Sequence, residues 1–465
     1  MSTRSQIPPE LVWQEVASLY RFIEPIIKGC ADLRDDYPVY TPPSREFFTH
    51  IQTLGTETLK FLETFPQKIL KDPRTASSKR QKLFSLKAAW EDLHEYVKPA
   101  LDADSLHLPT PLITALHDRL HENPKWRGYR FTLFHTIEAN YFEIPGSGAR
   151  NTANRIADLI EGTAFPPSLG LLGIPYSQGD GFFLNCSLAH EIGHFIYQED
   201  SSAVIASEID NTLQRMTDEI GELEEQDTLF CTELLSTWTE EIFCDLFAIT
   251  KIGPAYAFAL SQLIGASFLI GQSDGEPADF YSFTLTHPAE VSRIQAQQKL
   301  LDRLGWWQVI KDWKSAPVKV LHRCSTGSAL YTVESAFPTG VTQERFLQCH
   351  NEMCDYLIDY LMALLPKVNR DVRTFKEQAA AISEYLRRAV VPSTIVIDGK
   401  DKYPSSMVLL NAGFRFMLED LSLLFNNIQE SDSSSIEQRS RFIKRIELWL
   451  LKALEDCRLL THQVD

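Results

Sequence analysis

The chain of 465 residues is long enough to bury a large core, and its 44% hydrophobic and 23% charged residues exclude a wholly disordered protein. A net charge of −17 at pH 7 argues against a nucleic-acid-binding surface, which needs clustered lysine and arginine. Eight irregularly spaced cysteines fit reduced, mostly buried thiols in a cytoplasmic protein rather than a disulfide framework.

Residues 1–125 are predicted to form an N-terminal helical region. The opening residues contain no apolar segment typical of a signal peptide, so a cytoplasmic location is expected. Proline-containing breaks separate three runs in which apolar residues recur every three to four positions, a spacing typical of amphipathic helices. These runs are Leu11–Ile23, Phe47–Leu70 and Leu83–Val97.

Residues 126–304 are predicted to form the core that carries the chemistry. The stretch Tyr129–Ile137 alternates and is rich in aromatic and β-branched residues, which predicts a strand, and Tyr141–Ile144 is expected to pair with it. A glycine- and proline-rich passage over Gly162–Gly181 precedes a helix expected over Phe183–Gln198.

The second half of this core is predicted to be helical. Residues 200–228 are polar and acidic, which predicts a helical insertion with a solvated face; an acidic lid over the substrate is the alternative. A long helix is expected over Leu229–Lys251, ending near Gly253–Pro254. The apolar run Ala255–Ile270 predicts a buried helix and is too short to span a bilayer, so no membrane span is expected.

The last region, residues 305–465, is again predicted to be mostly helical. Its exception is a short strand and turn expected at Ser393–Gly399. The fold class expected for the whole chain is therefore mainly α (α+β), with a small β-sheet in the central core and helical regions on both sides.

The HEIGH motif at residues 190–194 is the most informative part of the sequence. Because His190 and His194 are four residues apart, they lie on one face of a helix and both imidazoles can bind a single metal ion. Glu191 is then placed to act on a metal-bound water. Zinc needs one further protein ligand in such a site, so a third ligand is expected elsewhere in the chain.

The long helix that follows supplies candidates for the third ligand. Glu241 and Asp245 are four residues apart on an otherwise apolar helix, where carboxylates without partners are costly to bury. Glu241 is expected to bind the metal, and Asp245 to hydrogen bond to a ligand histidine and fix its tautomer. Glu240 is the competing ligand, but the residue four positions after it is Cys244, which is a poorer orienting group than Asp245. The alternative for Glu241 and Asp245 is a pair of surface charges.

This order of motifs resembles the gluzincin metallopeptidases, the group that includes thermolysin. The resemblance covers about residues 183–301 and implies a zincin-like catalytic core that binds one Zn²⁺ ion. It implies that Glu241 is the third zinc ligand beside the two motif histidines, and that Asp245 supports one of those histidines.

A second segment resembles one branch of the gluzincins. Thr286–Ile294 contains an H-P-x-x-x-x-R element similar to that of the CAAX-prenyl-protease and HtpX-like branch. The resemblance implies that His287 and Arg293 face the substrate oxyanion. The alternative without a functional role is a helix N-terminus at which the histidine has no function and the arginine is a surface residue. Two features differ from that branch: the branch is membrane-embedded, and this chain has a helical insertion between His194 and Glu241.

The sequence therefore predicts a zinc-dependent metallopeptidase that hydrolyses a peptide or protein substrate, with Glu191 as general base. Arg293 and His287 are expected to stabilise the oxyanion. The strand over Tyr129–Ile137, or the one near Tyr141, is expected to offer an edge to an extended peptide. Two alternatives are a zinc-stabilised regulatory or scaffold protein with helical partner-binding regions, and a zinc hydrolase of non-peptide amides. The other nine histidines are expected to be structural.

Overall fold

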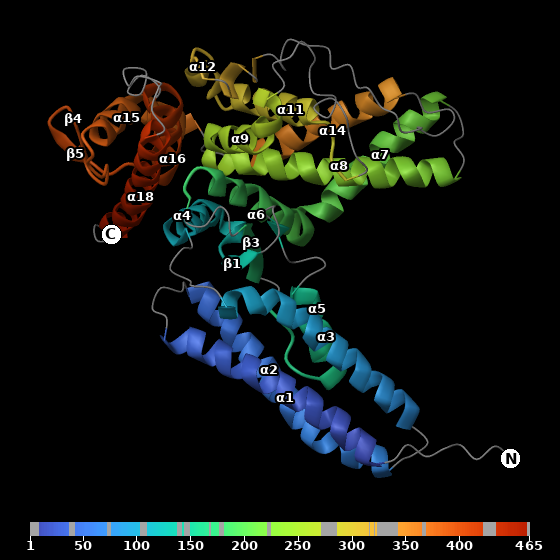
Figure 1. Ribbon diagram of the computed structural model, residues 1–465. Helices are drawn as coiled ribbons and strands as arrows, with labels where there is room; N and C mark the ends of the chain where they lie inside the picture. Colours follow the sequence, from blue (N-terminus) through green and yellow to red (C-terminus); the bar gives the residue numbers. More distant parts are fainter. Residues whose placement is uncertain are drawn as a thin grey trace. The chain divides into compact units, whose positions relative to one another are not determined.

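A computed structural model describes the chain over residues 9–36, 42–71, 76–102, 109–136, 142–143, 149–166, 169–175, 181–220, 225–270, 286–315, 317–319, 321–322, 343–364, 369–421 and 434–462. The described residues are mostly helical with two small sheets, which confirms the expected mainly α class (Figure 1). The chain forms two compact units. Unit 1 contains residues 1–108 and 128–179, and unit 2 contains residues 109–127 and 180–465. This division differs from the three consecutive regions expected from the sequence.

Unit 1 combines long helices with a small sheet. Its elements are α1 (Pro9–Asp36), α2 (Pro42–Lys71), α3 (Ala76–Asp102), β1 (Arg130–Thr136), β2 (Phe142–Glu143), α5 (Ala149–Ile160) and β3 (Leu169–Pro175). The three helical runs expected from the sequence form α1, α2 and α3, and their apolar stripes meet in one core. Trp90 is fully buried in this core, where its indole N–H donates a hydrogen bond to Thr58 Oγ1 at 3.2 Å.

The sheet of unit 1 has the strand order β1-β3-β2. The strand expected over Tyr129–Ile137 is confirmed as β1, but its partner is β3, which pairs with it in parallel from Arg130 opposite Leu169. The expected direct pairing with Tyr141–Ile144 is wrong, because β2 pairs with β3 instead. β3 lies inside the passage Gly162–Gly181, and such a buried parallel strand lacks the alternation that identifies exposed strands.

Unit 2 contains the predicted metal motif. Its elements are α4 (Thr110–His121), η3 (Pro124–Trp126), η4 (Leu184–Ser187), α6 (Leu188–Ile196), η5 (Tyr197–Ser201), α7 (Ser202–Ile220), α8 (Glu225–Ile252), α9 (Pro254–Ile270), α11 (Glu290–Arg303), α12 (Trp307–Ile310), α14 (Gln343–Leu364), α15 (Asn369–Arg387), β4 (Ile395–Ile397), β5 (Lys400–Lys402), α16 (Ser406–Arg415), η6 (Phe416–Asp420) and α18 (Ser434–His462). The strand and turn expected at Ser393–Gly399 are confirmed as the β4–β5 hairpin.

The helix α8 is the centre of unit 2, and α6, α7, α9, α11 and α14 pack against it (Figure 1). Every residue from Glu241 to Ile252 is buried, so each polar side chain in this stretch needs a partner. The helix ends where expected, because Gly253 adopts a φ of +64° that other residues rarely tolerate. Asn411 of α16 stabilises this end by donating to the Ile252 carbonyl at 2.9 Å.

The apolar run that follows forms α9, and its residues 255–260 are buried. No helix in the described part of the chain is both long enough and apolar enough to cross a membrane.

A lysine is buried near the end of α8. Lys251 is 3% exposed, and its ammonium group lies 4.4 Å from the centre of the Trp126 ring and 5.3 Å from that of Phe247. Burial, assisted by the charge of Arg119, lowers the pKa of Lys251 from 10.5 to about 7. The charged form of this side chain is therefore unfavourable in the folded protein.

Lys251→Met is expected to stabilise the protein most strongly at low pH. Between pH 7 and 10.5 the unfolded chain binds a proton at Lys251 that the folded protein does not, so stability rises with pH in this window and the full penalty applies below pH 7. At about 1.4 kcal/mol per pKa unit, the penalty is at most about 4–5 kcal/mol, partly offset by the aromatic contacts. Urea unfolding at pH 6 and pH 9.5 measures the difference. An equal gain in the free energy of unfolding at both pH values would contradict this account. Lys400→Met, at an exposed position, is the control.

Candidate metal centre

The crossing of α6 and α8 brings the two parts of the predicted site together. Gly193 is the point of closest approach: a Cβ atom at this position would lie 2.8 Å from Cys244 Cα and 3.0 Å from Cys244 Cβ. Such distances are too short for non-bonded carbon atoms, so a larger residue would push the helices apart. The glycine of the motif therefore sets the distance between the histidines of α6 and the carboxylates of α8.

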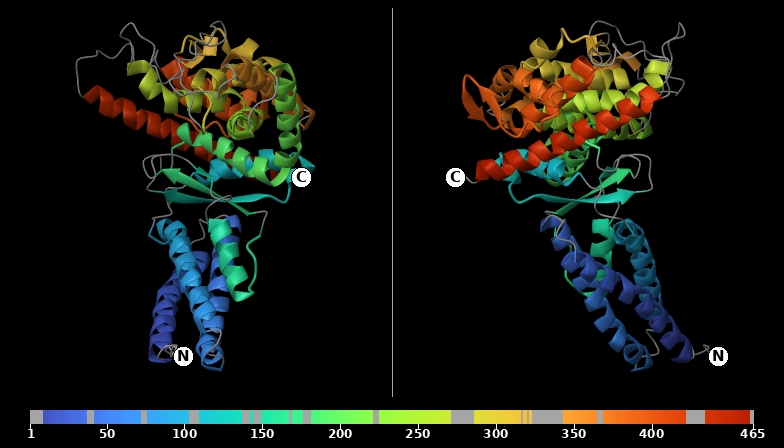
Figure 2. Two further views of the ribbon diagram at one scale, coloured as in Figure 1. Left: turned by 90° about the vertical axis from the view of Figure 1, so that its right-hand side faces the viewer. Right: turned by 60° about the vertical axis from the view of Figure 1, so that its left-hand side comes forward.

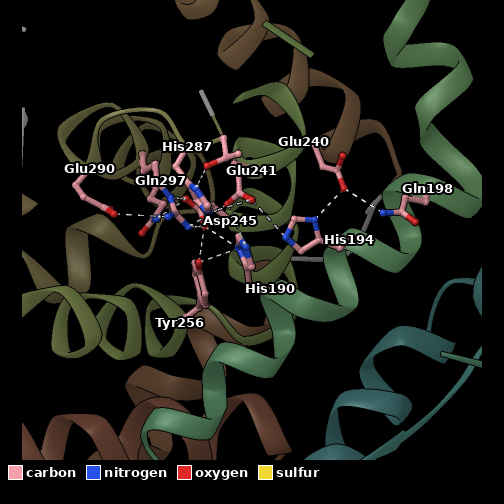
Figure 3. Close-up of polar contacts among 12 residues, drawn as sticks. His190, His194, Gln198, Glu240, Glu241, Asp245, Tyr256, His287, Glu290 and Gln297 are labelled. Atoms are coloured by element: carbon pink, nitrogen blue, oxygen red, sulfur yellow. Dashed lines mark hydrogen bonds and ion pairs between the residues drawn. The ribbon is translucent and has the colours of Figure 1, made fainter. Parts of the chain in front are cut away.

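The imidazoles of His190 and His194 converge on the carboxylate of Glu241 (Figure 3). His190 Nε2 lies 3.4 Å from Glu241 Oε2, and His194 Nε2 lies 3.6 Å from Glu241 Oε1. Ligand atoms of a tetrahedral zinc site, with bonds of about 2.0–2.1 Å, are about 3.3–3.4 Å apart. Both N···O distances are close to this spacing, and each histidine faces a different oxygen of the Glu241 carboxylate.

Carboxylates hold the other nitrogen of each histidine. His190 Nδ1 lies 2.9 Å from Asp245 Oδ1, and His194 Nδ1 lies 2.9 Å from Glu240 Oε1. An Nδ1–H that donates to a carboxylate leaves the Nε2 lone pair free for a metal. The contact between Asp245 and His190 Nδ1 is therefore the one that the expected role of Asp245 requires. Glu240, which competed with Glu241 as a ligand, instead orients His194.

Asp245 accepts hydrogen bonds from three further side chains besides His190. Arg293 donates from Nε to Oδ2 at 2.8 Å and from its terminal nitrogen to Oδ1 at 2.7 Å. Gln297 Nε2 donates to Oδ2 at 3.0 Å, and the Tyr256 hydroxyl donates to Oδ1. These donors come from α9 and α11, and they fix the orientation of a carboxylate that is fully buried.

Arg293 contacts Asp245, whereas it was expected to face the substrate oxyanion. Its side chain is 8% exposed, and its guanidinium forms a two-point contact with Asp245. The bidentate contact occupies the guanidinium, which also lies 3.7 Å from Glu290 Oε1. Arg293 is therefore placed to position Asp245, and through it His190, rather than to receive a substrate oxygen.

His287 lies at the exposed side of the site. Its side chain is 52% exposed, and its Nε2 is 3.6 Å from Glu241 Oε1. Thr286 Oγ1 contacts its Nδ1 at 2.9 Å. His287 therefore lies beside Glu241, and its imidazole reaches the site from a segment outside α6 and α8.

Glu191 is buried on α6 beside His190, with 8% of its surface exposed. Within the described residues no donor pairs with its carboxylate. Its charge is close enough to Cys244 to help raise the pKa of that thiol.

Cys244 was not expected at the site. His190, His194 and Cys244 each offer a ligand atom within 4.8 Å of the others, so this group could hold a metal ion. Cys244 follows Glu241 by three residues, and this helical spacing could have indicated a shared face. Burial and the neighbouring carboxylates, Glu241 first among them, raise the pKa of Cys244 well above its usual value.

The site carries excess negative charge. Glu240, Glu241 and Asp245 contact the two histidines, and the Arg293 guanidinium contacts the carboxylates of Glu241, Asp245 and Glu290. Burial alone would lower the pKa of His190, but hydrogen bonds to Asp245 and Glu241 and their charges raise it to about 10. Burial alone would raise the pKa of Glu241, but its hydrogen bond to His190 and the charges of His190, Arg293 and His194 lower it to about 2. The site therefore favours a cation.

The spacing of the motif histidines is not unique in the chain. His117 and His121 of α4 are also four residues apart, but their rings lie parallel with centres 5.9 Å apart, whereas those of His190 and His194 are 4.8 Å apart and nearly perpendicular. The spacing alone thus does not define a metal site.

Comparison of the chain with protein-family models, with curated proteins and with solved structures gives no match in any of the three. The function is therefore inferred from the geometry of the site itself.

Proposed function

We propose that the protein is a gluzincin-type zinc metallopeptidase in which His190, His194 and Glu241 bind the metal. The observation that carries the proposal is the convergence of both Nε2 atoms on Glu241 at 3.4 and 3.6 Å, with both Nδ1 atoms held by carboxylates. Two imidazoles and one carboxylate leave the fourth position of a tetrahedral ion open, as catalytic zinc sites require.

A zinc ion held there would polarise the scissile carbonyl and lower the pKa of the attacking water towards about 7. Glu191 then accepts a proton from this water and returns it to the leaving amine, so that water and peptide become an acid and an amine. His287 donates a hydrogen bond to the carbonyl oxygen from the exposed side. Arg293 acts through Asp245 as a positioning residue.

The third ligand is assigned to Glu241 rather than to Cys244. Glu241 is an ionised carboxylate with a depressed pKa, ready to bind a divalent cation. Cys244 would have to lose a proton from a buried thiol whose pKa is raised, next to several carboxylates. Its small side chain instead fits the close crossing of the two helices at Gly193.

Metal content separates these assignments. Glu241→Ala is expected to lose most of the bound zinc, whereas Cys244→Ala should retain it, because only the carboxylate completes the site. Zinc per protein is measured after dialysis, alongside folding by circular dichroism. Glu240→Ala is the matched control on the same helix, and it should weaken zinc binding only about 10–100-fold because it orients a ligand without being one. Full zinc occupancy in Glu241→Ala would exclude the proposed ligand set.

A second candidate function follows from the proximity of Cys244 to both histidines. If Cys244 and Glu241 both bound the ion, the site would have four protein ligands and would be structural. The protein would then be a zinc-stabilised scaffold. Loss of zinc in Cys244→Ala, together with no cleavage of a peptide mixture by the zinc-bound wild type, would favour this function.

A further inference from the structure

Tyr256 has a buried hydroxyl, and its partners among the described residues both belong to the candidate metal centre. The residue lies in the first turn of α9 and is 1% exposed. Its hydroxyl donates a hydrogen bond to Asp245 Oδ1, and the same oxygen lies 3.1 Å from His190 Nδ1 (Figure 3). A buried hydroxyl is unfavourable unless it is hydrogen bonded, so these two contacts account for a tyrosine in an otherwise apolar helix segment.

The corner between α8 and α9 brings Tyr256 back to Asp245, which precedes it by eleven residues. Gly253 turns the chain here with its φ of +64°. Asn411 of α16 holds both sides of the corner: its amide donates to the last carbonyl of α8 at 2.9 Å, and its carbonyl oxygen accepts from the Ala255 N–H at 2.9 Å. α16 packs against α8 and α9, although 156 residues separate Asn411 from Ala255 (Figure 2). The place of Tyr256 beside Asp245 is therefore fixed by contacts outside its own helix.

Three atoms that contact one another determine which nitrogen of His190 keeps a proton. They are His190 Nδ1, Asp245 Oδ1 and the Tyr256 oxygen. A carboxylate oxygen can only accept a hydrogen bond, so the single proton of the phenol is donated to Asp245. The phenol oxygen then offers a lone pair to Nδ1, as Asp245 Oδ1 does at 2.9 Å. Two acceptors at this nitrogen favour a proton on it, and Nε2, which faces Glu241, is left to bind a metal.

The ring of Tyr256 restricts the orientation of the same imidazole. The two rings are nearly parallel, with 8° between their planes and 6.0 Å between their centres. A rotation of the His190 imidazole about its χ2 angle would end this parallel arrangement and would move Nδ1 away from both of its acceptors. Tyr256 thus restrains His190 in two ways, through its hydroxyl at Nδ1 and through its ring at the plane of the imidazole.

We propose that Tyr256 is a positioning residue of the metal centre, which holds the proton of His190 on Nδ1 and directs Nε2 to the metal. The inference deepens the proposed function: it rests on His190 as a metal ligand, but it does not rest on peptide hydrolysis. Among the described contacts, the donors from α11 reach only the carboxylate of the His190–Asp245 pair, whereas Tyr256 contacts the imidazole as well. Tyr256 was not among the residues expected from the sequence, because it lies on a different helix from either partner.

The zinc affinities of two variants separate the ring from the hydroxyl. Tyr256→Phe keeps the ring and is expected to weaken zinc binding by about 3–10-fold, whereas Tyr256→Leu loses both restraints and should weaken it by about 10–100-fold. Competition with a chelator measures the affinities, and circular dichroism checks that each variant is folded. The matched control is Tyr360→Phe, which removes a hydroxyl that contacts Ser201 Oγ at 3.3 Å in the same unit and should leave zinc affinity unchanged.

A spectroscopic measurement distinguishes this role from a loss of packing. With Co²⁺ in place of zinc, the Nδ1–H protons of His190 and His194 are expected as two strongly shifted proton NMR signals that exchange with water. Tyr256→Phe should make one of these protons exchange faster and leave the other unchanged, because His194 Nδ1 is held by Glu240 instead. Glu240→Ala should affect the other signal, which assigns each signal to its histidine.

Unchanged zinc affinity in a folded Tyr256→Leu variant would contradict this inference alone, because the wild type would still bind zinc as the proposed function requires. If Tyr256→Leu does not fold, wild-type affinity and unchanged Nδ1–H signals in Tyr256→Phe would contradict it equally. Equal changes in both Nδ1–H signals, or an equal loss of affinity in Tyr360→Phe, would assign the effect to a general loosening of the helices. A wild type that binds no zinc would instead contradict the proposed function, and this inference with it.

Discussion

Glu191→Gln is expected to abolish peptide hydrolysis while leaving the metal bound. Glutamine keeps the size of the side chain but cannot accept the proton of the attacking water, and a positioned general base contributes about 10²–10⁴-fold to the rate. Glu191 is beside His190 on α6 but is not one of the three converging ligands, so zinc content should remain at the level of the wild type. Digestion of a peptide mixture, followed by mass spectrometry and by zinc analysis of the same samples, measures both quantities.

Glu233→Gln provides the matched control, since it makes the same chemical change at an exposed position of α8. It should leave hydrolysis and zinc content unchanged. Hydrolysis that survives Glu191→Gln at the wild-type rate would show that the protein does not use this residue as a base. A zinc-bound wild type that cleaves no peptide would instead favour the scaffold function or a non-peptide amide as substrate.

Asp245→Ala is expected to destabilise the protein by about 3–5 kcal/mol and to weaken zinc binding by about 10–100-fold. The loss of stability arises because the Arg293 guanidinium, with a side chain 8% exposed, would be left buried without its two-point partner. The loss of affinity arises because His190 Nδ1 would lose the carboxylate that orients its ring. Urea unfolding and zinc titration against a chelator measure the two effects separately.

Two further variants separate the charge effect from a general loss of packing. Glu290→Ala removes a carboxylate that also faces Arg293, but at 3.7 Å and without a two-point contact, so it should cost much less. Replacing both members of the pair, with Asp245→Leu and Arg293→Met, should cost less than Asp245→Ala alone, because no buried charge is left uncompensated. A double variant that is less stable than Asp245→Ala would contradict the assigned role of the pair.

The parts of the site that lie on single helices could be predicted from the sequence. The i, i+4 spacing places His190 and His194 on one face, and the same spacing places Glu241 and Asp245 on one face of α8. The apolar surroundings of these two carboxylates indicated that they need partners. The geometry agrees, since Glu241 faces both histidines and Asp245 holds one of them.

The partners that come from other helices could not be predicted in this way. Tyr256 and Gln297 complete the environment of Asp245 from α9 and α11, and nothing in their local sequence indicates which helix they face. Glu240 and Glu241 are neighbours, and only the crossing of α6 over α8 decides that one orients His194 while the other faces both histidines. Arg293 was expected to face the substrate oxyanion. Its motif does not determine the direction of its side chain, which contacts Asp245 instead.

The sequence by itself determined the helical class of the chain and indicated the candidate ligands and the candidate base, because these depend on periodicity and spacing within one segment. The tertiary structure decided the pairing of β1 with β3, the role of Arg293 and the presence of Cys244 beside the two histidines. These depend on contacts between segments far apart in the chain. Gly193 depends on both. The sequence shows that the residue is glycine, but only the tertiary structure shows that α8, about fifty residues away, packs directly against it and leaves no room for a side chain.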